Sequence, residues 1–269
     1  MRAHRIAAIA LGSLLAASAC TSRNGEPPPA ARTAAASPAP LPSGSEGALI
    51  ALGRDIIERT PARMPGYVRA GMSCEACHVG AGTKPHGGSF VGIYATFPQW
   101  NKRARRYIAL QDRLAECFLY SMNGRPPAYS SHEMVALVAY MAFLSRGTPV
   151  GENLSGQGLE RVVTERTPSI ARGERVYAQQ CTACHGASGA GDGGRPPLWG
   201  ARSFNDGAGM HRIATMAGFV RYNMPFGSPP DTLSKQDALD VSAFVLSHAR
   251  PKFNRHATIV FPPLPASYF

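Results

Sequence analysis

Two motifs with the same spacing hold the residues best suited to chemistry in this sequence of 269 residues. Each motif has two cysteines separated by two residues, with a histidine directly after the second cysteine: Cys74, Cys77 and His78 in the first, and Cys181, Cys184 and His185 in the second. Two thiols at this spacing can add across the two vinyl groups of a haem, while the adjacent imidazole reaches the iron from one side. Zinc binding by the cysteine pairs is the alternative, but it gives no reason for a histidine to follow directly in both places. The sequence therefore predicts two covalently bound haem c groups, with His78 and His185 as iron ligands.

The second haem needs a ligand on the other side of its iron, and Met224 is the best candidate. Met224 precedes Pro225 in the stretch between the second motif and the last helical segment. A Met-Pro loop at this point is where small c-type cytochromes hold a thioether ligand, which suits a high-potential electron-transfer haem. Met210 and Met216 are rivals, and any of the three methionines can instead serve only to pack the core.

The first half has no Met-Pro pair, and Cys117 lies in the corresponding stretch, residues 113–124. The basic residues around it favour the thiolate form, which donates strongly to iron and holds a haem at low potential. Met122 is the alternative ligand. Burial as a small apolar residue, which is common for a free cysteine, is the alternative role for Cys117.

The elements that must position these residues repeat in the two halves of the chain. In each half an amphipathic helix is expected first, at residues 48–58 and 169–180, and the haem motif follows it. Each half then ends in a strongly periodic helix, whose start is marked by a capping pattern at residues 130–133 and 234–237. Strand-like alternation is weak throughout. We therefore predict an all-α fold with two tandem cytochrome c-type domains, each wrapped around one covalent haem.

The start of the chain has the features of an export signal. Arg2 and Arg5 precede a short apolar stretch, and three small residues lead directly to Cys20. This pattern resembles a bacterial lipoprotein signal, with ordinary cleavage near Ala19 as the alternative. We therefore expect a periplasmic protein, anchored to a membrane through lipid on Cys20. The expected organisation is a signal peptide (1–19), a disordered Pro/Ala-rich tether (20–45), an N-terminal cytochrome c domain (46–145), a linker (146–168) and a C-terminal cytochrome c domain (169–269).

The chain is strongly basic, with a formal net charge of +11. An exported haem protein is not expected to bind nucleic acid. The excess charge instead suits the haem propionates and a small anionic substrate. It is densest in residues 102–106, although these can also form no more than a solvated surface strip.

The order of several residues in the first half resembles the di-haem thiosulfate dehydrogenases, and the resemblance extends over residues 48–251. It is carried by the first haem motif, Phe97, Pro98, Gln99, Trp100, Arg103, Asp112, Arg113, Cys117, Phe118, Ser121, Met122, Asn123 and Gly124, and in the second half by Asn223, Met224, Pro225, Phe226 and Gly227. Trp100 is a departure, because tyrosine is commoner there. Asn223 is another, because some family members have a lysine there that exchanges with the methionine ligand.

The resemblance implies a role for each matching residue. Cys117 is expected to be the distal ligand of the first, catalytic haem, with Arg103 and Arg113 binding the anionic substrate and Ser121 nearby. The second haem, with Met224 as its ligand, passes electrons to a downstream carrier. The implied reaction joins two thiosulfate ions into tetrathionate.

Two other functions remain open from the sequence. One is a non-catalytic tandem electron-transfer cytochrome. The other is a haem subunit of the sulfur-oxidising multienzyme system, whose haem subunits also use cysteine ligands but act on a carrier-protein thiol.

Overall fold

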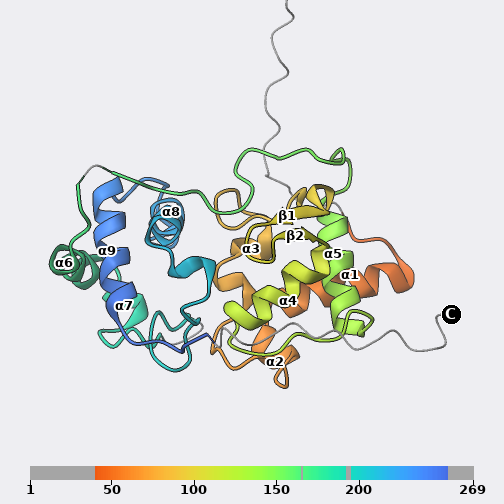
Figure 1. Cartoon of the computed structure of the whole chain (residues 1–269), viewed down its shortest axis with the longest axis horizontal. Coiled ribbons are helices and arrows are strands. Elements are labelled where there is room, and N and C mark those ends of the chain that lie inside the picture. Colours follow the sequence, from red (N-terminus) through yellow and green to blue (C-terminus); the bar gives the residue numbers. More distant parts are fainter. Residues whose placement is uncertain (1–39, 165, 192–194, 254–269) are drawn as a thin grey trace, which may run out of the picture. The chain divides into compact units, whose positions relative to one another are not determined.

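The computed structural model describes residues 40–164, 166–191 and 195–253 (Figure 1). The expected signal peptide, Cys20, most of the expected tether and residues 254–269 lie outside these ranges. In the first half the helices are α1 (Gly44–Glu58), α2 (Thr60–Arg63), α3 (Val79–Gly82), α4 (Leu110–Tyr120) and α5 (His132–Leu144), with short 3₁₀ helices at Cys74–Ala76 and Ile93–Thr96. In the second half they are α6 (Ile170–Gln180), α7 (Thr182–His185), α8 (Ile213–Asn223) and α9 (Lys235–Ser247), with a 3₁₀ helix at Gly209–His211. No helix within the described ranges is both long and apolar enough to cross a membrane.

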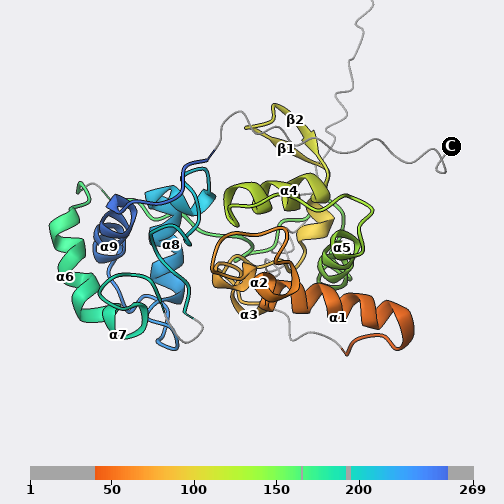
Figure 2. The ribbon, with the colours of Figure 1, turned by 90° about the horizontal axis from the view of Figure 1, so that it is seen from below.

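The two halves share one helical plan, which confirms the predicted all-α fold of two tandem cytochrome c-type domains. In the first half α1 packs against α5, and in the second α6 packs against α9. Helix α9 lies between α6 and α8 in both views (Figures 1 and 2). The first helix of each half therefore lies against the last one, as the repeated sequence pattern requires.

Serine side chains cap three of these helices, two of them at the predicted capping patterns. The Ser131 hydroxyl accepts the Met134 N–H at the start of α5, and the Ser234 hydroxyl accepts the Asp237 N–H at the start of α9. Ser169 caps α6 in the same way. Each hydroxyl satisfies a backbone donor that has no partner within its helix, so these serines determine where the helices begin.

One element was not predicted from the sequence. Strands β1 (Gln99–Asn101) and β2 (Arg106–Ile108) pair antiparallel, with Trp100 opposite Tyr107, and form a hairpin next to α4. The Asn101 side chain accepts the N–H groups of Arg103 and Ala104, and it thereby fixes the tight turn between the strands. The basic residues 102–106 lie on this exposed hairpin.

The expected linker was predicted at residues 146–168, and its residues 156–158 lie beside the loop after the first haem motif. The His86 N–H donates to the Gly156 carbonyl at 2.8 Å, and the Gly88 N–H donates to the Gly158 carbonyl at 3.0 Å. Val162 is buried against residues of α8 and α9. The segment therefore contacts both haem-motif halves, although its exact limits as a linker stay a prediction.

A glycine permits the close approach of the paired helices in each half. A Cβ atom on Gly53 of α1 would lie 2.1 Å from the Ala136 carbonyl oxygen of α5. In the second half, a Cβ on Gly173 of α6 would lie 1.9 Å from the Asp240 carbonyl oxygen of α9. Backbone atoms cannot yield as a flexible side chain can, so a larger residue must push the helices apart.

We predict that Gly53→Ala and Gly173→Ala each lower the free energy of unfolding of the haem-loaded protein by about 1–3 kcal/mol, the usual cost of overpacking. Within a helix, alanine is intrinsically more stabilising than glycine by about 1 kcal/mol. A net loss of stability must therefore come from the clash between the helices. Thermal unfolding followed by circular dichroism measures the effect. Gly209→Ala is the control, because its added methyl group would meet no heavy atom within 4 Å. Equal melting temperatures in all three variants would contradict the prediction.

Candidate functional site

The first haem motif is held at the junction of α1 and α2 by Thr60. This threonine is fully buried, and its hydroxyl accepts the Cys74 N–H at 3.0 Å. The same hydroxyl lies 2.7 Å from the Ile56 carbonyl and 3.3 Å from the Cys74 sulfur. The position of the first attachment cysteine is therefore set by the end of α1.

The His78 ring is oriented by a hydrogen bond to the loop that follows it. Its Nδ1 atom lies 2.6 Å from the Gly88 carbonyl oxygen, which can only accept, so Nδ1 carries the proton and Nε2 is left for iron. Burial lowers the pKa of His78, which keeps the ring neutral as a metal ligand must be. The ring also stacks on Phe90 at 4.2 Å between centroids.

Only glycine fits at position 88. Its φ of +67° lies in the left-handed region, and a Cβ there would lie 2.5 Å from the Cys77 carbonyl oxygen and 2.8 Å from His78 Nδ1. The close contact that orients the imidazole therefore depends on this glycine.

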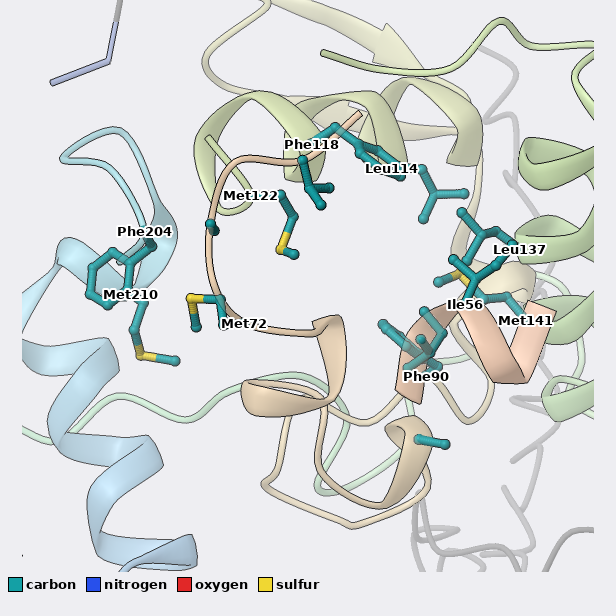
Figure 3. Packing of buried hydrophobic residues seen from close by; sticks show 14 of the residues in the cluster. Ile56, Met72, Phe90, Leu114, Phe118, Met122, Leu137, Met141, Phe204 and Met210 are labelled. Atoms are coloured by element: carbon teal, nitrogen blue, oxygen red, sulfur yellow. The ribbon is translucent and has the colours of Figure 1, made fainter. Parts of the chain in front are cut away.

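A cavity opens beside this motif. Figure 3 shows four of the apolar side chains that line it: Met122 beside α4, Met72 before the motif, and Phe204 and Met210 from the second half. The cavity brings together five of the predicted site residues, Cys74, Cys77, His78, Cys117 and Ser121, and its wall also includes Met72, Ser73, Met122, Phe204 and Met210. The arrangement provides two attachment thiols, an imidazole and a further thiol around one apolar space.

The structure corrects one expectation about Cys117. Burial, with smaller contributions from the nearby Cys74 and Glu116, raises the pKa of its thiol to about 12, and only Arg113 acts to lower it. Surrounding basic residues therefore do not favour the thiolate by themselves. A thiolate at this position requires a stronger partner, and a metal ion that coordinates the sulfur is such a partner.

The two predicted substrate arginines lie outside the cavity lining but belong to one network behind Cys117. Arg113 Nη1 donates to Glu116 Oε2 at 2.6 Å, and Asn101 Nδ2 donates to Glu116 Oε1 at 2.9 Å. Asn101 in turn accepts the Arg103 N–H at 2.8 Å. The guanidinium of Arg103 lies over the Tyr120 ring at 3.9 Å and donates to the Gly207 carbonyl at 2.9 Å.

The sequence analysis missed Glu116 and Asn101, the two buried members of this network. Glu116 follows Arg113 by three residues, a spacing at which helix side chains meet, so the ion pair could have been predicted. The contact of Asn101 with Glu116 joins the hairpin to α4, and no local pattern in the sequence indicates it.

The second haem motif lies on α7 and the turn before it. Cys181 is half-buried, Cys184 is exposed and His185 is buried. Burial lowers the pKa of His185, and the Pro196 carbonyl partly opposes this effect. The imidazole is therefore neutral, as an iron ligand must be.

Met224 lies directly at the end of α8 and is half-buried in the core that also contains Cys181. Among its rivals, Met210 lines the first cavity, and Met216 is buried within α8. The preceding residue, Asn223, is buried, and its amide donates to the Phe219 and His86 carbonyls, both at 3.0 Å. An asparagine fixed in this way cannot exchange with Met224 as a lysine could.

The residues present fit one haem c in each half. In the first half the fit is shown by an apolar cavity whose lining includes both cysteines and the histidine of the motif. In the second, a buried neutral histidine and a thioether residue provide suitable iron donors. The assignment of individual ligands stays a prediction.

Comparison with known proteins defines the class first. Residues 66–150 match the family described as "SoxA/TsdA, cytochrome c domain", and residues 170–249 match the family described as "Cytochrome c". The chain is thus a c-type cytochrome with two haem domains, and it carries two covalently bound haem c groups.

Full-length relatives then define the family. The chain is 43% identical to a thiosulfate dehydrogenase of Allochromatium vinosum over 94% of this chain and 96% of that protein. It is 41% identical to a thiosulfate dehydrogenase of Stutzerimonas stutzeri, over 79% of this chain and 71% of the relative. The chain belongs to the thiosulfate dehydrogenase family.

A solved structure has the same fold. Thiosulfate dehydrogenase (TsdBA) from Marichromatium purpuratum, in its "as isolated" form, aligns with a TM-score of 0.78 and 32% identity over 83% of this chain. This chain spans about half the length of that protein, since the alignment covers 50% of it.

We predict that Cys117→Ala keeps both covalent haems, because the attachment cysteines are untouched. The first haem should lose its thiolate signature in electron paramagnetic resonance, and its midpoint potential should rise as a weaker donor, water or Met122, takes the position. Ser121→Ala, which alters the same cavity wall without removing the sulfur, is the control and should keep the signature. Unaltered spectra in Cys117→Ala would show that this sulfur does not bind the iron.

Proposed function

We propose that this protein oxidises two thiosulfate ions to tetrathionate and delivers the two electrons to a downstream carrier. The observation that carries the proposal is the lining of the first cavity, where Cys117 accompanies Cys74, Cys77 and His78. A simple electron carrier has no need for a reactive sulfur beside one of its haems. The second half, with Met224 as the candidate ligand, has the residues of an ordinary electron-transfer site.

Cys117 divides the reaction into two steps in this proposal. Its sulfur first bonds to the outer sulfur of one thiosulfate, and this formation of an S–S bond releases two electrons. A second thiosulfate then attacks that outer sulfur, so that tetrathionate leaves and the Cys117 thiolate is regenerated. The two haems supply storage for one electron each.

Positive charge is required because two dianions must approach each other. Arginine binds such oxyanions through charge-assisted and often bidentate hydrogen bonds. In the proposal Arg113 and Arg103 provide these contacts, supported by their shared network through Glu116 and Asn101. Substrate binding then competes with Glu116 for Arg113, and Ser121 supplies a further hydrogen-bond donor from the cavity wall.

Location forms the second part of the proposal. The basic and apolar start of the sequence, followed by small residues and Cys20, supports export to the periplasm and a lipid anchor on Cys20. Electrons then leave from the second haem to a soluble or membrane-bound carrier outside the cytoplasm.

A single-chain assay tests the reaction and its arginines together. Thiosulfate should reduce the haems of the purified protein, and tetrathionate should form at one molecule for every two thiosulfate consumed. We predict that Arg113→Gln and Arg103→Gln each lower kcat/KM about tenfold to a hundredfold while haem content is unchanged, since a charge-assisted contact contributes about 1.5–3 kcal/mol.

The matched control for this assay is Arg54→Gln. Arg54 forms an intrahelical ion pair with Glu58 at 2.8 Å, comparable to the pair of Arg113 with Glu116, but it lies on α1. Its loss should leave kcat/KM nearly unchanged, because an exposed ion pair contributes only about 0–1 kcal/mol to stability and Arg54 does not line the cavity. Unchanged kinetics in both test variants would remove the arginines from the site, and a failure of thiosulfate to reduce the haems would contradict the proposed function itself.

A further prediction concerns the anchor. The substitution Cys20→Ser should move the protein from the membrane fraction to the soluble fraction without changing its haem spectra, because lipid on Cys20 is the only proposed attachment to the membrane. Cell fractionation and mass spectrometry of the N-terminal peptide measure this, with Ser22→Ala as the control. An unmodified protein that is freely soluble and has no lipid on its N-terminus would disprove the anchor.

A further inference from the structure

Arg250, just after α9, is a buried cation in the second half. Arg250 is 8% exposed. Two hydrogen bonds hold its guanidinium: Nη2 donates to the Val245 carbonyl at 2.8 Å, and Nη1 donates to the Leu198 carbonyl at 3.4 Å. The group also lies over the Phe204 ring, 4.3 Å from its centroid. These contacts hold the guanidinium in one orientation between α9 and the segment around Leu198.

One donor of this guanidinium is unsatisfied. Arg250 Nε is buried and has no hydrogen-bond partner among the described residues. Burial lowers the pKa of Arg250 to about 10, which still leaves the group charged at neutral pH. A buried charge without a partner is costly, so its presence points to a ligand that supplies the opposite charge.

Within residues 195–253, the charged neighbours of Arg250 do not supply it. Asp206 is the carboxylate that acts on Arg250, but its Oδ1 accepts the Phe253 N–H at 2.7 Å and its Oδ2 pairs with Lys252 at 3.4 Å. His211 cannot be the counter-ion either, because an imidazole is neutral or positively charged, and burial and the charge of Arg250 both lower its pKa. The local balance of charge therefore remains positive.

Arg250 is linked to the loop after the second haem motif through successive hydrogen bonds. Leu198, whose carbonyl it binds, donates its own N–H to the Gly189 carbonyl at 2.8 Å, and Gly191 donates to the His185 carbonyl at 3.2 Å. The segment that Arg250 contacts is thus hydrogen-bonded to the loop that follows His185. A shallow, open groove is lined by Asn123, Gly200, Ala201, Ala249, Arg250 and Pro251.

A haem c attached to the second motif brings carboxylates of its own, the two propionates of the macrocycle. We propose that Arg250 is the counter-ion of one propionate of the second haem, with its Nε–H as the donor. An arginine suits this role because its planar fork matches a carboxylate and keeps its charge when buried. The proposal requires the second haem but not the thiosulfate reaction.

Such a pair raises the potential of the second haem. The ferric haem has one more positive charge than the ferrous haem, so a fixed nearby cation disfavours the ferric state, and a neutralised propionate no longer favours it. In a buried setting this effect is little screened by salt.

Spectroelectrochemical titration of the whole haem-loaded protein tests the pair. In Arg250→Gln the midpoint potential of the second haem should fall, and the propionate bending band in the resonance Raman spectrum should shift as a strong donor is lost. Arg250→Lys keeps the charge but lacks the fork, so it should retain most of the potential while the band still shifts. If Arg250→Gln does not accumulate with both haems, the Raman band of Arg250→Lys tests the pair: a shifted band supports the proposal, and an unshifted band contradicts it.

Lys252→Gln is the matched control. It also removes one positive charge, two residues from Arg250, but the Lys252 side chain is 84% exposed. It should leave the Raman band unchanged and alter the potential much less than Arg250→Gln. An unmoved potential and band in the Arg250 variants, or a change confined to the first haem, would overturn the proposal. A third outcome would also overturn it: added sulfate shifts the potential of the unmodified protein but not that of Arg250→Gln, and the Raman band stays fixed in all variants. The groove would then bind a free anion instead of a propionate.

Discussion

Enclosing a flat, apolar macrocycle imposes a constraint that the rest of each half obeys: the chain must leave an apolar space in its middle while its helices close tightly elsewhere. In the first half the space is the cavity between the haem motif and α4, and the closure is the contact of α1 with α5 at Gly53. The second half repeats the closure at Gly173. Thr60 connects the two requirements, since it ends α1 and holds Cys74 at the cavity wall.

Features fixed by local chemistry could be predicted from the sequence, whereas those fixed by contacts between distant segments could not. The caps at Ser131 and Ser234 are formed by residues three positions apart, so the starts of α5 and α9 were predictable. The hairpin was not, because each strand has three residues, too few to show an alternating pattern, and its turn depends on Asn101. Its attachment to α4 is a contact over fifteen positions, from Asn101 to Glu116.

The candidate site divides in the same way. The spacing of the haem motifs reflects covalent geometry, which acts within five residues and was therefore readable. The state of the Cys117 thiol was misjudged, because counting nearby basic residues ignores both burial and the neutralisation of Arg113 by Glu116. The position of Arg103 is set partly by Gly207, 104 positions away, and only the folded chain brings the two together.

The two halves differ in electrostatics as well as in ligand chemistry, and the two differences act in the same direction. Beside the first cavity, the buried carboxylate of Glu116 is paired with Arg113, so this pair brings little net charge to the first haem. Beside the second motif, the buried charge is the cation Arg250, which favours the ferrous form. A thiolate ligand lowers a haem potential and a thioether ligand raises it, so the proposed Cys117 and Met224 ligation adds to this gradient. Under the proposed function, this gradient drives electrons from the first site to the second even though both sites are built on one repeated helical plan.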